Sequence, residues 1–174
     1  MISETMCQAL NEQLKWEMYS ANLYLSMSGY LNKLGLTGFA HWMRAQYEEE
    51  TSHAMKFFDY VLKRDGDIQL ETIEGPKQEW KDLIDVFEDS LHHESEITWR
   101  INNLMKMAKE EGDYASDIFL HWFVVEQVEE EETVRDILAK LKIIGGKGDG
   151  VLLMDKELSQ RNFSRKSLKS ITVE

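Results

Sequence analysis

The sequence predicts an all-α protein: a four-helix bundle with one long crossover between the second and third helices and a short fifth helix. Proline occurs once, at Pro76, in 174 residues. Apolar residues recur every three or four positions through four long stretches, the pattern of helices that bury one face. Two connections between these stretches are short and one is long, and this determines how the helices run.

The first two predicted helices cover about 3–33 and 38–64. Ser3 and Thr37 are suitable N-caps, because each hydroxyl precedes the start of an apolar repeat. The glycine-containing sequence LGLTG separates the two helices, and a DGD sequence at 65–67 ends the second.

The third and fourth predicted helices cover about 81–111 and 113–142, on either side of Gly112. The glycine-rich sequence GGKGDG at 145–150 then precedes a short apolar helix at about 150–160.

The connections predict the topology. Short turns at Gly35 and Gly112 make the first pair and the second pair of helices antiparallel hairpins. The connection at 66–80 has about 15 residues, which at about 3.3 Å each can span about 50 Å. That is enough to run back along a helix of about 42 Å. We therefore expect the second and third helices to be parallel.

We assign 1–163 to one helical domain and 164–174 to a polar, locally basic tail, since a chain of this length forms one domain. Arg161, Lys166 and their basic neighbours could bind an acidic partner, nucleic acid or a mineral surface. We expect instead a solubilising chain end that contributes nothing to assembly.

Composition excludes several classes of protein. The formal net charge is −12, which disfavours nucleic acid as a partner and favours cations. The sequence has no apolar run long enough for a membrane span and no signal-peptide pattern, so we expect no membrane partner. Cys7 is the only cysteine. We therefore expect a protein of the reducing cytoplasm.

Polar residues interrupt the inward faces of all four long helices. Counted from the hairpin turns, these interruptions lie at the same height to within about one helical turn. Buried together without compensation, four carboxylates would repel one another strongly. No basic residue shares these faces, so a buried ion-pair network is disfavoured and a pair of metal ions is favoured. Oxygen ligands with one imidazole suit iron or manganese. The interrupting residues are Glu17, Glu50, His53, Glu94, Gln127 and Glu130.

At these motifs the sequence resembles the bacterial non-haem ferritins over almost the whole chain to about Phe163. The matching segments are NEQLKWEMYS, YEEETSH, LHHESEIT and HWFVVEQVEEEE, in that order. The resemblance implies ferroxidase activity at a dinuclear iron centre in each subunit, with storage as hydrated ferric oxide. Oxygen or hydrogen peroxide would accept the electrons, and a hollow shell of 24 identical chains would hold the product.

The resemblance also implies individual roles. Glu17, Glu50 and His53 would hold the first iron, with Glu50 as the bridge to the second. Glu94 and Glu130 would hold the second iron. Two further residues would act beside the centre: Gln127 as an oxygen-facing or supporting group, and Tyr24 as a source of an electron.

Glu49, Glu126 and Glu129, with Glu130, match a third iron site of bacterial ferritins, although a run of glutamates is also the pattern of a solvated helix face. Bacterioferritins carry their haem-binding methionine where this sequence has Thr51. We therefore expect iron but no haem.

Two other functions remain open from the sequence: a di-iron oxidase or peroxidase of the rubrerythrin type, and a non-catalytic, metal-buffering helical assembly. The sequence has no Cys-x-x-Cys pair for a rubredoxin-type iron. His41, His92, His93 and His121 are expected at the surface or at its boundary, away from the metal centre.

Overall fold

The computed structural model describes residues 1–161, and it contains five helices there and no strand. The predicted helix ends differ from the observed ones by at most two residues. The boundary at 163/164, with Arg165, Lys166 and Lys169 beyond it, lies outside the described residues. The helices are α1 (Glu4–Lys33), α2 (Thr37–Lys63), α3 (Leu83–Glu111), α4 (Tyr114–Ile143) and α5 (Asp149–Leu158).

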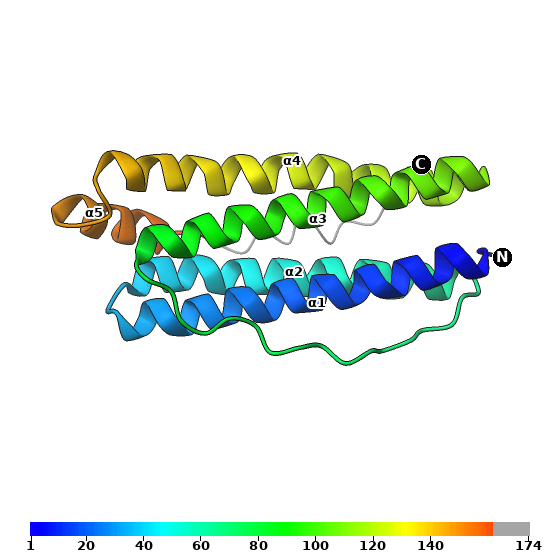
Figure 1. Ribbon diagram of the computed structural model, residues 1–174, viewed down its shortest axis with the longest axis horizontal. Helices are drawn as coiled ribbons and strands as arrows, with labels where there is room; N and C mark the ends of the chain where they lie inside the picture. Colours follow the sequence, from blue (N-terminus) through cyan, green and yellow to red (C-terminus); the bar gives the residue numbers. More distant parts are fainter. Residues whose placement is uncertain (162–174) are drawn as a thin grey trace.

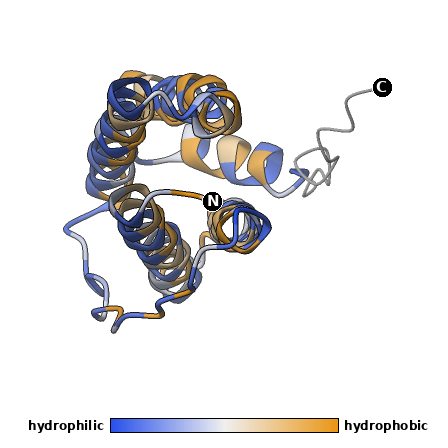
Figure 2. Cartoon of the chain, turned by 90° about the vertical axis from the view of Figure 1, so that its right-hand side faces the viewer, coloured by the Kyte–Doolittle hydropathy of each residue, from blue (hydrophilic) through white to orange (hydrophobic). Residues whose placement is uncertain are grey.

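The four long helices lie side by side, and α5 packs at one end of them (Figure 1). Helices α1 and α2 form one antiparallel hairpin, and α3 and α4 form the other. The crossover between α2 and α3 runs the length of the bundle on its outside, so these two helices are parallel. The predicted all-α bundle with one long crossover is therefore confirmed. Viewed end-on, each helix alternates hydrophilic and hydrophobic segments, as amphipathic helices do (Figure 2).

Side-chain caps explain where three of the long helices begin. The hydroxyl of Ser3 accepts a hydrogen bond from the amide of Met6 at 3.0 Å, as predicted. Aspartates serve the same purpose at the starts of α3 and α4, through Asp82 and Asp113. Gly112 ends α3 in the left-handed conformation, with φ of 67°, which glycine adopts without steric cost.

The cap of α2 differs from the prediction. Thr37 lies within the helix, Leu36 precedes it, and neither side chain caps the helix start. Asp155 of α5 takes this role: its Oδ1 accepts hydrogen bonds from the amides of Gly38 and Phe39 at 2.8 and 2.9 Å. The first turn of α2 is therefore capped by a residue more than a hundred positions away, which ties α5 to the bundle.

The apolar core consists of two clusters separated along the bundle. One cluster surrounds Phe39, Trp42 and Phe87 at the α5 end, and the other surrounds Phe57 and Phe123 at the opposite end. On every long helix the buried apolar residues of the two clusters leave a gap in the middle. Within residues 1–161, no helix is long and apolar enough to cross a membrane.

Candidate metal centre

A buried polar layer fills the gap between the two apolar clusters. The six residues predicted to interrupt the helix faces all lie in this layer, and each exposes no more than 5% of its surface. No lysine or arginine is buried anywhere in residues 1–161, so the layer is not an ion-pair network with basic side chains. The layer therefore contains four carboxylates and one imidazole.

Glu17, Glu50 and His53 form the most compact part of the layer, the inner cluster. Potential ligand atoms of these three residues lie within 4.8 Å of one another. The Nδ1 atom of His53 is 3.7 Å from Oε2 of Glu50, one turn earlier on α2. Nε2 of His53 is buried and has no hydrogen-bond partner in the described part of the chain. Such a group is suited to a ligand-binding site.

Glu94 and Glu130 complete the layer from α3 and α4, although neither belongs to the inner cluster. The phenolic hydroxyl of Tyr24 donates to Oε1 of Glu94, and Nε2 of Gln127 donates to its Oε2 at 3.1 Å. Gln127 and Tyr24 therefore reach the polar layer through their hydrogen bonds to Glu94.

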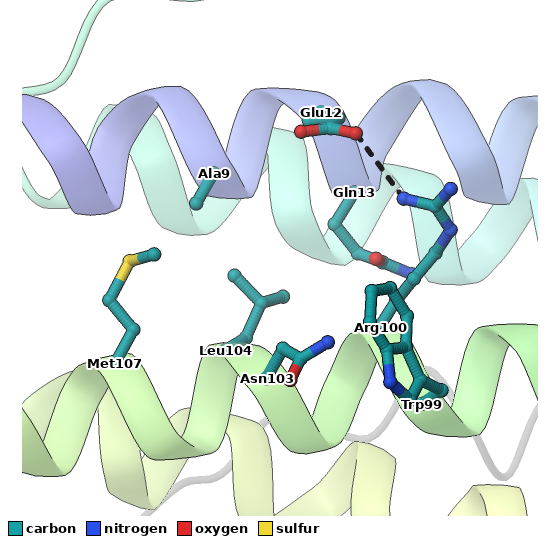
Figure 3. Close-up of a pocket in the computed structure, with 8 residues that line it drawn as sticks. All are labelled: Ala9, Glu12, Gln13, Trp99, Arg100, Asn103, Leu104 and Met107. Atoms are coloured by element: carbon teal, nitrogen blue, oxygen red, sulfur yellow. Dashed lines mark hydrogen bonds and ion pairs between the residues drawn. The ribbon is translucent and has the colours of Figure 1, made fainter.

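Two glutamines that the sequence did not single out as site residues also bind these carboxylates. Gln46 donates to Oε2 of Glu130 and Gln13 donates to Oε1 of Glu17, both at 2.8 Å. Gln13 also lines a pocket of about 360 Å³ between α1 and α3 (Figure 3). An amide one helical turn from a buried glutamate was the available signal for Gln13.

Burial dominates the electrostatics of the layer. Desolvation, followed by the charge of Glu50, raises the pKa of Glu17 well above its usual range. Desolvation and the charges of Glu94 and Glu130 do the same to the pKa of Glu50. Desolvation, with repulsion from Glu94, raises the pKa of Glu130 to about 8. A cation would reverse these shifts, because it stabilises the ionised carboxylates.

A second group of potential ligands, the outer cluster, contains Glu49, His53 and Glu126. Their ligand atoms also lie within 4.8 Å of one another, and both glutamates are partly exposed. Glu129 is exposed and is not part of this group. Thus the structure brings together two of the three additional residues that the resemblance assigns to a third iron.

His93 differs from its predicted place at the surface or its boundary. It is buried between α3 and α1, where Nε2 lies 2.7 Å from the hydroxyl of Ser20. Burial lowers the pKa of His93 to about 4, so its imidazole is neutral at pH 7. His93 directly precedes Glu94, so its side chain points away from the inward face that carries Glu94 and towards α1. The apolar repeat marks only the inward face, and it therefore did not predict that His93 is buried. His41, His92 and His121 are exposed.

A bundle with one long crossover and a buried carboxylate and histidine layer at mid-length defines the class of ferritin-like metal proteins. The family profile described as "Ferritin-like domain" matches residues 7–144. The chain therefore belongs to the ferritin family, as the sequence motifs predicted.

The comparisons with individual proteins agree over nearly the whole chain. The bacterial non-heme ferritin of Bacteroides fragilis is 42% identical over 161 residues, which cover 92% of this chain and all of the relative. The bacterial non-heme ferritin of Campylobacter jejuni is 40% identical over 95% of this chain and 99% of its own length. An open-pore ferritin of the archaeon Archaeoglobus fulgidus superposes with a TM-score of 0.92 at 48% identity, covering 93% of this chain and all of that chain.

Proposed function

We propose that this protein is an iron-storage ferroxidase, which oxidises Fe(II) at a dinuclear centre and stores the product in a hollow shell. One observation carries the proposal: four glutamates and one histidine are buried together at mid-bundle with no basic side chain among them. Membership of the ferritin family, shown by the profile match over residues 7–144, supports the same function.

The proposed roles follow the resemblance to the ferritins, and the compact group of Glu17, Glu50 and His53 supports them. Glu17, Glu50 and His53 bind one Fe(II), and Glu94 and Glu130 bind the other. By the resemblance to the ferritins, Glu50 would bridge them. Hard carboxylate ligands stabilise Fe(III) over Fe(II), which favours oxidation.

The chemistry balances with either oxidant. Two Fe(II) ions each give up one electron; dioxygen takes both with two protons and becomes hydrogen peroxide. Hydrogen peroxide instead takes two electrons and two protons and becomes two water molecules. Iron is thus the substrate, and it is also the stored product. The net charge of −12 supports attraction of Fe(II) towards the protein.

The proposal includes a cytoplasmic shell of 24 chains without haem. The relatives from Bacteroides fragilis and Campylobacter jejuni are named as non-heme ferritins, which supports the absence of haem. Thr51 also supports it, because threonine has no thioether sulfur to bind haem iron at the position where bacterioferritins carry methionine.

The test is anaerobic loading of the metal-free protein with Fe(II), followed by a pulse of oxygen, with absorbance and the mass of the assembly recorded. We expect rapid oxidation of about two ions per chain in the wild type. Glu17→Ala should slow oxidation at least tenfold and leave the assembly intact. The control is Glu12→Ala, which removes an exposed carboxylate from the same helix.

Each contrary result identifies another function. Binding without oxidation faster than in buffer would indicate a metal-buffering assembly. Oxidation that depends on an organic substrate, in a small oligomer, would indicate an oxidase or peroxidase of the rubrerythrin type.

A further inference from the structure

Arg161 follows α5 and lies against one face of α2. The ring nitrogen Nε2 of His41 donates to the carbonyl oxygen of Arg161 at 2.7 Å. The guanidinium lies over the ring of Trp42, 4.6 Å from its centroid, and Nη2 is 2.8 Å from Oε2 of Glu49. Trp42 and Glu49 are seven residues apart and therefore share one helix face. The sequence suggested that Arg161 belongs to a free chain end. In the structure its backbone carbonyl and its guanidinium both contact α2 instead.

The docking of α5 explains why Arg161 reaches this position. Val151 and Met154 of α5 are buried in the apolar cluster around Phe39. Asp155 binds the first amides of α2 at 2.8 and 2.9 Å. These contacts bring the end of α5 alongside α2, and the six residues that follow Asp155 extend to Glu49.

Glu49 also belongs to the outer cluster with His53 and Glu126. A guanidinium at hydrogen-bond distance supplies the positive charge that a bound metal ion would otherwise supply to this carboxylate. Nη1 of Arg161 is buried without a hydrogen-bond partner in the described chain, so the pairing with Glu49 leaves part of the guanidinium unsatisfied. The side chains of Arg161 and Glu49 are 24% and 20% exposed. Such a partly solvated pair is weak enough for a metal ion to displace.

We propose that Arg161 is a resident cation of the outer cluster, which competes with a metal ion for Glu49 and so controls whether a third ion binds. This inference rests on the proposed function, because it presupposes an inner pair of iron ions. The inner pair binds without moving Arg161. A third hard cation binds only when the guanidinium leaves Glu49, and α5 thereby sets the capacity of each subunit.

The test measures binding rather than activity. Assembled, metal-free protein is titrated with Fe(II) under anaerobic conditions by equilibrium dialysis, and iron positions are read from anomalous diffraction of loaded crystals. Arg161→Gln should raise the affinity for the third ion about two- to fivefold, because the competing charge is gone. Arg161→Lys keeps a positive charge and should bind the third ion much as the wild type does. Unchanged affinity in Arg161→Gln would overturn the inference.

Three further variants separate the possible causes. Arg161→Met keeps an unbranched apolar side chain against Trp42 but removes the charge. The same gain in affinity for the third ion in this variant would exclude lost packing as the cause of the gain. No gain in affinity would overturn the inference. In a Glu49→Gln background, Arg161→Gln should add nothing. The matched control is Arg135→Gln, which breaks another Arg–Glu pair, of 3.2 Å, on α4 and should leave binding unchanged.

The two proposals fail in distinguishable ways. If the wild type binds no iron at the inner cluster, the proposed function fails, and this inference fails with it. If two inner ions bind in every variant and the third is insensitive to Arg161, only this inference fails.

Discussion

Gln13 donates a hydrogen bond of 2.8 Å to Glu17, one turn later on α1, and both side chains are buried. Gln46 and Gln127 contact Glu130 and Glu94 in the same way. Each amide orients a carboxylate but adds no positive charge. The four buried carboxylates therefore still require cations to compensate their negative charge. An arginine in any of these places would satisfy the charge and compete with a metal ion.

Replacing Gln13 by methionine should therefore weaken metal binding without unfolding the protein. Methionine has a similar length but no amide donor, so Glu17 loses its orienting hydrogen bond. Loss of such a supporting contact typically costs about 10- to 100-fold in metal affinity. The measurement is anaerobic Fe(II) binding by calorimetry, with exposed Gln8→Met as the control on the same helix. Equal affinities in the two variants would show that Gln13 serves only packing beside the pocket.

Tyr24→Phe should slow iron oxidation while preserving the bundle. The hydroxyl donates to Glu94, whereas the ring packs edge-on against Trp42 with centroids 6.4 Å apart, and phenylalanine keeps that packing. The control is Tyr30→Phe, which removes a hydroxyl that donates to the carbonyl of Trp80 at 2.7 Å, away from the centre. Each variant should lose about 1 kcal/mol of stability.

Only Tyr24→Phe should also change the oxidation rate. Freeze-quenched electron paramagnetic resonance during oxidation would detect a tyrosyl radical in the wild type and in Tyr30→Phe. The same radical in Tyr24→Phe would assign the electron to another residue.

Glu130 should make the metal-free protein less stable as pH rises. Its pKa is raised to about 8 in the folded state, mainly by burial, from an ordinary value near 4.5. The folded state therefore binds the proton more tightly than the unfolded state does. The stability from this group is complete below pH 4.5 and is lost as pH rises through 8.

Glu130→Gln removes this loss, because the amide stays neutral at every pH. At pH 9, and in the presence of a chelator, the variant should exceed the wild type by roughly 2 kcal/mol or more per subunit. At pH 4 the difference should be much smaller. Denaturant midpoints at both pH values measure this, and exposed Glu129→Gln is the adjacent control. Parallel curves for wild type and Glu130→Gln would show that Glu130 titrates normally.

The sequence predicted the helices and the inner residues because both depend on local periodicity. A polar residue at a core position, such as Glu17 or Glu94, stands out against the apolar residues one turn away, and helix length places it at mid-bundle. Contacts between distant segments leave no such pattern. Asp155 as the cap of α2 and Arg161 as the partner of Glu49 both depend on how α5 docks. Hence Thr37 was assigned incorrectly as the cap, and Arg161 was grouped with a free chain end although it pairs with Glu49.

The docking of α5 depends on a glycine at the start of α2. A Cβ atom on Gly38 would lie 1.7 Å from the carbonyl oxygen of Asp155, far inside any permitted contact. Gly38→Ala must therefore push α5 away from α2, and it would also withdraw Arg161 from Glu49. Only the first turn of α2 loses its cap, so the four long helices should otherwise persist. Far-ultraviolet circular dichroism should consequently stay close to that of the wild type.

Assembly is the property that this change should alter, because α5 exposes Leu152 and Leu153, which we expect to contact neighbouring subunits of the shell. Native mass spectrometry of Gly38→Ala should show smaller oligomers in place of a 24-subunit species. Gly29→Ala is the control, since a Cβ there meets nothing within 4 Å and exchanging glycine for alanine in a helix stabilises it by about 0.5–1 kcal/mol. If Gly38→Ala assembled as the wild type does, α5 would have no part in holding the shell together. Its function would then be confined to placing Arg161 beside Glu49.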